Sequence, residues 1–512
     1  MINETIKLKE ISVFTELFFG ISITYLIVYG LFVAFNNRNN YPLIQSALIN
    51  LGVLTLAMAC FLTFNDSINV FKSISFNNTI VNDYLSSCSK IIIGVSSIIC
   101  LLLIKQYLIS QKINHFEYII ILLFSILGLF LLCSSNDFLT TYLALELQSL
   151  SFYLLAAFKK NSFYSVESGL KYFILGSFSS GLFLFGSSLV YGALGTINFT
   201  DFKNLFLFEN FSATNINLFV NTEILFQTEN FVTIGLLFIF VSLFFKLALA
   251  PFHLWSPDVY ENSPSSSAFF FAVVPKISIF VVILRFSYYA LFESISWSQE
   301  VIAVISIASI VVGSLGGLEQ RKFKSLLAYS SISHMGYLLI TLASQSVSGI
   351  QMLFCYLVIY MTSGLCIWSI FMLTRLKKVD SKKQNKDLAD FVQLRKSNIM
   401  LAVILMTALF SIAGLPPVIG FLVKVNVFLI AMEKSLYFLA VFSILFSVIS
   451  TFFYLRIVKV LFFEPVLVGK LYYPINSIKI SIVVVLFCSF VFLFANPTIL
   501  YLISHKMSLL FI

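Results

Sequence analysis

The chain has 512 residues, of which 59% are hydrophobic and only 11% are charged, with a formal net charge of +9. Soluble domains carry about 25% charged residues, so this composition excludes a water-soluble globule and indicates a protein whose solvent is lipid. The positive charge does not indicate nucleic-acid binding, because the lysines and arginines of membrane chains collect in loops on the cytoplasmic or matrix side.

The apolar stretches are long and continuous, as in IIIGVSSIICLLLI at residues 91–104. Strands of a membrane barrel would alternate instead, so helices of about 20 residues are expected. We therefore predict an all-α polytopic membrane protein with about fourteen transmembrane helices. They are placed at 13–34, 44–64, 90–110, 116–135, 138–158, 169–194, 231–254, 267–292, 299–318, 324–344, 349–374, 398–430, 435–462 and 478–503.

Proline interrupts the seventh and twelfth spans near the middle of the membrane. The seventh reads FVSLFFKLALAPFHLW, with Pro251, and the twelfth reads LFSIAGLPPVIGFLVKVNVFLIAM, with Pro416 and Pro417. Broken helices at corresponding places in two halves are typical of transporters built from internal repeats. Packing kinks without a transport role are the alternative, since proline is common in transmembrane helices.

The two breaks suggest a division of the chain into four parts. We expect an N-terminal three-helix segment at 1–115 and a first antiporter-like repeat of five helices at 116–292. A second five-helix repeat is expected at 299–462, and a C-terminal span at 463–512. Basic residues gather in the odd-numbered loops, above all at 159–160, 321–324 and 375–396. The positive-inside rule therefore places both termini on the side opposite to these loops.

Four ionisable residues fall deep inside predicted spans, namely Glu146, Lys246, Lys276 and Lys424. A charge at the bilayer centre costs about 2.5–3.5 kcal/mol on insertion scales, so four such residues indicate ion handling. Burial makes lysine release its proton more readily and a nearby carboxylate has the opposite effect, which suits reversible proton binding. Structural ion pairs that hold helices together are the alternative.

Three further residues are weaker candidates. Lys171 lies near one end of the sixth span and is as well placed to reach the membrane surface as to act inside. His334 lies within the tenth span beside a stripe of serines, where a histidine that only bonds neighbouring helices is the alternative. Glu16 is close enough to a membrane face that a solvated position and a functional one are both open.

Motifs for redox cofactors are not found in the sequence. It has no G-x-G-x-x-G after a strand, no Walker A sequence and no cysteine set spaced for an iron–sulfur cluster. We therefore expect that the chain handles ions and holds no redox centre or metal. The seven scattered cysteines are expected to be free.

Several long segments, in order, resemble one family. They are TYLALELQSLSFYLLAAF, FKLALAPFHLWSPDVYENSP, VPKISIF, RKFKSLLAYSSISHMGYLL and GLPPVIGFLVK. They closely resemble subunit 2, an antiporter-like membrane subunit, of proton-pumping NADH:ubiquinone oxidoreductase (respiratory complex I) of the mitochondrial type. The resemblance implies that Glu146, Lys246, Lys276 and Lys424 form the proton path, with Lys171 and His334 as further members.

The resemblance also implies surroundings. The chain is expected to translocate protons in the mitochondrial inner membrane, driven by quinone reduction in neighbouring subunits, with both termini in the intermembrane space. NADH, FMN, iron–sulfur clusters and ubiquinone are expected elsewhere in the complex. Partners would be another antiporter-like subunit, small quinone-side subunits and lipids, and no nucleic acid. The A/T-biased composition, with 58 phenylalanines, suits an organelle-encoded gene.

Two other functions remain open at this point. An autonomous monovalent cation/proton antiporter would share the fold and should be active alone in liposomes. A structural membrane spacer should tolerate neutral residues at all four buried charges.

Overall fold

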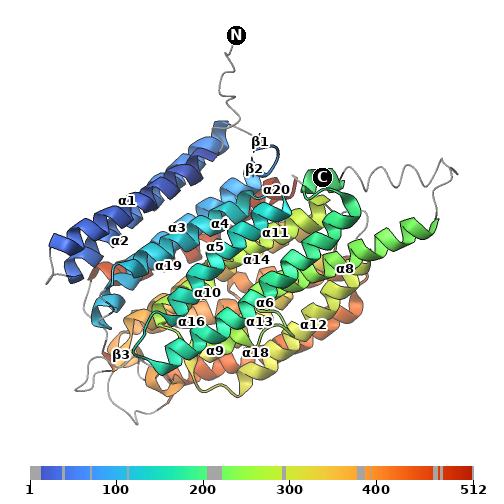
Figure 1. Ribbon diagram of the computed structural model, residues 1–512. Coiled ribbons are helices and arrows are strands. Elements are labelled where there is room, and N and C mark those ends of the chain that lie inside the picture. Colours follow the sequence, from blue (N-terminus) through green and yellow to red (C-terminus); the bar gives the residue numbers. More distant parts are fainter. Residues whose placement is uncertain are drawn as a thin grey trace.

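The structure is a computed structural model. It describes residues 13–36, 41–69, 72–111, 113, 115–203, 222–290, 296–376, 387–392, 394–464, 471–472 and 477–509. Almost all of these residues are helical, and the long helices run side by side in one bundle (Figure 1).

Three helices and a hairpin form the N-terminal segment. They are α1 (Phe14–Asn36), α2 (Tyr41–Asn69), β1 (Lys72–Ser75), β2 (Ile80–Asp83) and α3 (Tyr84–Ser110). The two strands pair antiparallel, with Lys72 opposite Asp83. Asp83 then caps α3, because its carboxylate accepts a 2.9 Å hydrogen bond from the Ser86 amide. In Figure 1, α1 and α2 stand at one edge of the bundle.

The first half of the bundle follows. It comprises α4 (Glu117–Ser134), α5 (Phe138–Ala157), α6 (Phe163–Leu194), α8 (Thr222–Leu247), α9 (Trp255–Asn262), α10 (Ser265–Val273), α11 (Lys276–Leu284) and the π-helix η2 (Arg285–Ala290). Successive helices α4, α5, α6 and α8 pack pairwise.

The second half has the same helical character. Its elements are α12 (Ser296–Leu318), α13 (Phe323–Ala343), α14 (Val347–Leu373), β3 (Arg375–Leu376), the 3-10 helix η3 (Leu388–Phe391), α15 (Leu394–Ser397), α16 (Ile399–Ala413), α17 (Ile419–Glu433), α18 (Tyr437–Phe462), β4 (Leu471–Tyr472), α19 (Ser477–Ala495) and α20 (Pro497–Ser508). The short strands β3 and β4 pair antiparallel. Helix α20 packs on α14 and α3, so the end of the chain contacts the N-terminal segment.

Burial separates a central group of helices from an outer ring. Every residue from Ser265 to Tyr288 in α10, α11 and the start of η2 is buried, and α13 and α14 are almost completely buried. By contrast, only about a third or less of the residues of α1, α6 and α18 are buried, and large apolar side chains such as Ile21, Phe178 and Phe438 are exposed. An apolar exterior is the surface that a helix bundle presents to lipid.

The helical prediction is confirmed, and each of the fourteen predicted stretches holds helix. Within the described residues, ten helices are long and apolar enough to span a membrane by themselves, or eleven when the bent pair α19 and α20 is taken as one span. The others are α5 and the segments that contain the two predicted breaks. Helix α8 ends at Leu247, and Gly414–Val418 separates α16 from α17.

Some features were not predicted. Pro275 also interrupts the eighth span, between α10 and α11, and α19 and α20 meet at a bend of 78°. The β1–β2 hairpin was not expected either. The limits of the two repeats, at 116–292 and 299–462, stay a prediction, and parts of the 1–115 and 463–512 segments lie outside the described residues.

Candidate functional site

The first group of predicted residues lies where α5 meets the end of α8. Lys246 is half-buried in the last turn of α8, and its Nζ donates a 3.5 Å hydrogen bond to the hydroxyl of Tyr153 in α5. Glu146 accepts a 3.4 Å hydrogen bond from Ser149, which stands one turn before Tyr153 on the same helix. Glu146 and Lys246 are not ion-paired, because no contact within 4.0 Å joins them. Any electrostatic interaction between these two side chains therefore acts over more than 4.0 Å.

An aromatic residue forms a hydrogen bond with the backbone at the break after α8. The indole Nε1 of Trp255 donates a 2.9 Å hydrogen bond to the carbonyl of Phe245, which also accepts a 3.0 Å hydrogen bond from the amide of Ala248. Trp255 is itself stacked on Tyr172, with ring centroids 4.5 Å apart, and Tyr172 touches the edge of Tyr153. This packing fixes the chain around Lys246.

Lys276 lies at the centre of the bundle. It is the first residue of α11, directly after Pro275, and only 5% of it is exposed. Its Nζ donates a 2.7 Å hydrogen bond to the hydroxyl of Tyr360 in α14 and lies 4.6 Å from the centre of that ring. Both contacts favour a cation.

His334 is held between two tyrosines. Its Nδ1 is hydrogen-bonded to the hydroxyl of Tyr356 at 2.7 Å, and its Nε2 to that of Tyr454 at 3.1 Å. The imidazole also lies against the ring of Tyr360, with centroids 5.6 Å apart. Both ring nitrogens therefore have partners that can donate or accept a proton.

Lys424 of α17 forms a hydrogen bond across the second break. Its Nζ donates a 2.8 Å hydrogen bond to the carbonyl of Ala413, the last residue of α16, and so caps the negative end of that helix. Gly414 makes this possible in two ways. Its φ of 78° is left-handed, and an added Cβ would come within 2.6 Å of Cδ of Lys424.

A cavity lies beside Lys424. Its volume is about 20 Å³, room for about one water molecule, and its lining includes His334, Tyr360, Ser411 and Lys424. The hydroxyl of Ser411 is buried and has no hydrogen-bond partner in the described part of the chain. A buried hydroxyl without a partner on the wall of a cavity is a place for ordered water. The cavity therefore joins α13, α14, α16 and α17 at one polar point.

Lys171 has different surroundings. Its side chain is 46% exposed and forms ion pairs with Glu167 at 3.0 Å and with Asp258 of α9 at 3.1 Å. The structure therefore does not bury Lys171 as it buries Lys276 and Lys424.

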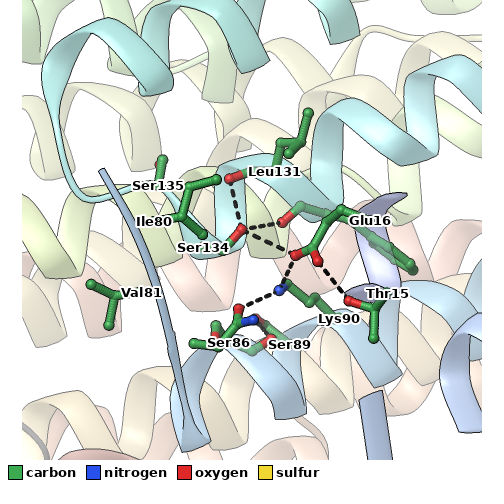
Figure 2. A network of polar contacts seen from close by, with 12 residues as sticks. Thr15, Glu16, Ile80, Val81, Ser86, Ser89, Lys90, Leu131, Ser134 and Ser135 are labelled. Carbon is green, nitrogen blue, oxygen red and sulfur yellow. Dashed lines mark hydrogen bonds and ion pairs between the residues drawn. The ribbon is translucent and has the colours of Figure 1, made fainter. Parts of the chain in front are cut away.

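Sequence analysis missed a buried ion pair at the N-terminal edge of the bundle. Figure 2 shows Lys90 of α3 and Ser134 of α4 directed toward the carboxylate of Glu16 of α1. Thr15 donates to the same carboxylate at 2.6 Å, and Lys90 also donates to Asn82 at 2.6 Å. The expectation that left a solvated Glu16 open is wrong on that point, because only 4% of this residue is exposed.

A second pair lies near the first. Arg285 of η2 donates a 2.8 Å hydrogen bond to the carboxylate of Asp83, and it also reaches the carbonyls of Val81 and Ser135. These partners stand more than 140 positions apart in the chain. No local pattern could have predicted them. All seven cysteines are free, as expected.

Comparison with known proteins shows the family of the chain. Residues 135–450 match the family model described as NADH:quinone oxidoreductase/Mrp antiporter, transmembrane. NADH-ubiquinone oxidoreductase chain 2 of Marchantia polymorpha is 35% identical over 98% of both chains. NADH-quinone oxidoreductase subunit N of Pelagibacter ubique is 38% identical over 88% of both. The chain therefore belongs to the NADH:quinone oxidoreductase/Mrp antiporter family and, within it, to the chain 2 (subunit N) group of complex I.

Solved structures share the fold. A chain of respiratory complex I from Thermus thermophilus superposes with a TM-score of 0.76 at 24% identity, over 95% of this chain and 98% of that one. A chain of the Mrp complex from Dietzia sp. gives 0.78 at 16% identity, over 98% and 97%. The bundle is thus the multi-pass membrane fold common to complex I and Mrp subunits.

Proposed function

We propose that the chain is a proton-translocating membrane subunit of respiratory complex I, and that its buried lysines carry the proton. One observation carries the residue assignment: Lys276 and Lys424 are each only 5% exposed, yet neither has a carboxylate within 4.0 Å among the described residues. Structural ion pairs were the alternative, and they would require such partners. An unpaired lysine in this position is costly, which favours a function that needs its proton.

The roles of the candidate residues follow from their contacts. Lys246 and Glu146 form one end of the path, Lys276 and His334 its centre, and Lys424 the other end. Lys171 is assigned a surface position near the entry, because its ion pairs keep it at the edge of the bundle.

We further propose the setting of this subunit. Its relatives include chain 2 of NADH-ubiquinone oxidoreductase from plants, which supports a place in the mitochondrial inner membrane. Quinone reduction in neighbouring subunits supplies the energy, and NADH, FMN, iron–sulfur clusters and ubiquinone bind there. Both termini face the intermembrane space, as the distribution of basic loops indicates. The two broken spans belong to two five-helix repeats.

The proposal is tested in the purified complex reconstituted into vesicles. Lys276→Met keeps the length and apolar stem of the side chain but removes the transferable proton. We expect NADH-driven acidification and quinone-linked NADH oxidation to fall together, while a native gel shows the complex assembled. Lys459→Met, at an exposed position of α18, is the matched control. Normal pumping by an assembled Lys276→Met complex contradicts the proposal.

A further inference from the structure

Tyr360 occupies a position between two of the buried lysines. From the middle of α14 its hydroxyl accepts the 2.7 Å hydrogen bond from Lys276 of α11. The same side chain lines the cavity that also contains Lys424 of α17. Tyr360 thus touches the central lysine on one side and the polar space of the last lysine on the other.

The chemistry of a phenol suits this position. The hydroxyl of tyrosine has one donor hydrogen as well as acceptor lone pairs. Because Lys276 occupies an acceptor position, the O–H of Tyr360 remains to donate elsewhere. The cavity offers an acceptor, since the unpartnered hydroxyl of Ser411 lies on its wall.

We propose that Tyr360 is the relay residue that passes a proton between Lys276 and the cavity of Lys424. This inference rests on the proposed function. It adds a residue that carries no formal charge and therefore does not stand out among the buried charges of the sequence.

The transfer conserves atoms and charge. One N–H bond of the Lys276 ammonium breaks as its proton binds the oxygen of Tyr360, and the O–H bond of Tyr360 breaks as its own proton moves to a water molecule in the cavity. That water then gives a proton to the neutral amine of Lys424. Lys276 ends as an amine, Lys424 as an ammonium and Tyr360 as a phenol again.

The geometry explains why a hydroxyl serves here. The Nζ of Lys424 is directed to the carbonyl of Ala413, and the Nζ of Lys276 is directed to Tyr360. No hydrogen bond joins the two lysines in the described part of the chain. Two like charges in direct contact would also repel each other. A neutral group that both donates and accepts connects them without adding charge.

Tyr360→Phe in the assembled complex is the first test, because it removes one oxygen and keeps the ring beside Lys276. We expect NADH-driven acidification to fall on the order of a hundredfold or more, the range for a lost proton-transfer group. Tyr118→Phe is the control. Tyr118 is also fully buried, and its hydroxyl donates to Ser266 at 2.8 Å, away from the lysines. The Tyr118→Phe complex should pump protons at the normal rate.

Comparison with Lys276→Met separates this inference from the proposed function. If Lys276→Met is inactive and Tyr360→Phe pumps as fast as Tyr118→Phe, the relay is wrong and the proposed function stands. If Lys276→Met itself pumps normally, the proposed function fails first.

A series of fluorinated tyrosines at position 360 then separates relay from positioning. These analogues keep the hydroxyl and nearly the same size, but their O–H is a stronger acid. A relay predicts that the pumping rate changes progressively along the series. If the rate is constant while Tyr360→Phe is inactive, the hydroxyl only positions Lys276, and the relay is overturned.

Discussion

Lys90 and Lys276 are both buried lysines, but their surroundings differ. Lys90 contacts the carboxylate of Glu16 and the amide oxygen of Asn82, so its charge is compensated. Among the described residues, Lys276 contacts only the hydroxyl and ring of Tyr360 as polar or cation–π partners. A paired lysine is held in its charged form, whereas a lysine with neutral partners exists in either form at a smaller difference in free energy. We therefore propose a structural role for Lys90 and a role in proton transfer for Lys276.

The Glu16–Lys90 pair should therefore behave as a structural contact. Removing one partner leaves a buried, unpaired charge, so Glu16→Gln and Lys90→Met should each destabilise the subunit by about 3–5 kcal/mol. The double variant should recover much of that loss, because no charge is left alone. Thermal unfolding and the yield of assembled complex on native gels measure this. A double variant as damaged as the sum of the single ones contradicts the assignment.

We expect Glu146 to influence Lys246 through its negative charge and not through a direct contact. It lies beyond ion-pair distance of Lys246, and at an effective dielectric of about 20 such an attraction is below roughly 4 kcal/mol. We expect Glu146→Gln to slow pumping roughly tenfold, for a loss of about 1.4 kcal/mol. Glu146→Asp keeps the charge and should be milder. Equal rates for the two variants would point to packing as the role of Glu146.

Among the elements, the two broken spans solve the same problem with different residues. Backbone carbonyls beside a break inside the bundle need donors. In the first half the Phe245 carbonyl accepts from the Ala248 amide and from the neutral N–H of Trp255, and in the second half Lys424 donates to the carbonyl of Ala413. The second break therefore depends on a residue that can lose its proton, and the first does not.

This double role of Lys424 can be separated by substitution. Lys424→Gln keeps an N–H donor on a shorter side chain but removes the transferable proton, whereas Lys424→Met removes both. We expect both variants to lose pumping. Only the methionine variant should lose, in addition, about 1–3 kcal/mol of stability for the unsatisfied carbonyl. Acidification assays and thermal unfolding of the complex compare them. Normal pumping by Lys424→Gln would reduce the residue to a helix cap.

The helices and their breaks were largely predictable from the sequence. The side-chain contacts between different helices were not. Hydropathy indicates where a helix is long enough to span a membrane, and proline marks where it breaks, so α8 and the α16–α17 pair were expected to be interrupted. The contacts of Glu16 with Lys90, and of Lys276 with Tyr360, join residues 74 and 84 positions apart. They depend on how helices pack, which one sequence does not encode locally. Tyr360 was also missed because a neutral residue carries no cost that marks it.

For the whole molecule, the layers of the bundle explain where the site lies. Helices α10, α11, α13 and α14 are surrounded by others and carry Lys276, His334 and Tyr360. Lys246, in the last turn of α8, and Lys424, in the second turn of α17, lie beside the two breaks, on either side of these helices in the chain. Lys276 and Lys424 are thus kept away from lipid, and the proposed proton path crosses from the first half of the bundle to the second.

A density map of the assembled complex that resolves ordered water tests the central claim most directly. A proton path needs hydrogen-bonded groups at about 3 Å steps. We predict waters between Glu146 and Lys246, between Lys246 and Lys276, and in the cavity between Tyr360 and Lys424, so that the chain of polar groups is continuous. A dry apolar layer that separates any two of these lysines in every state of the working complex would contradict the account.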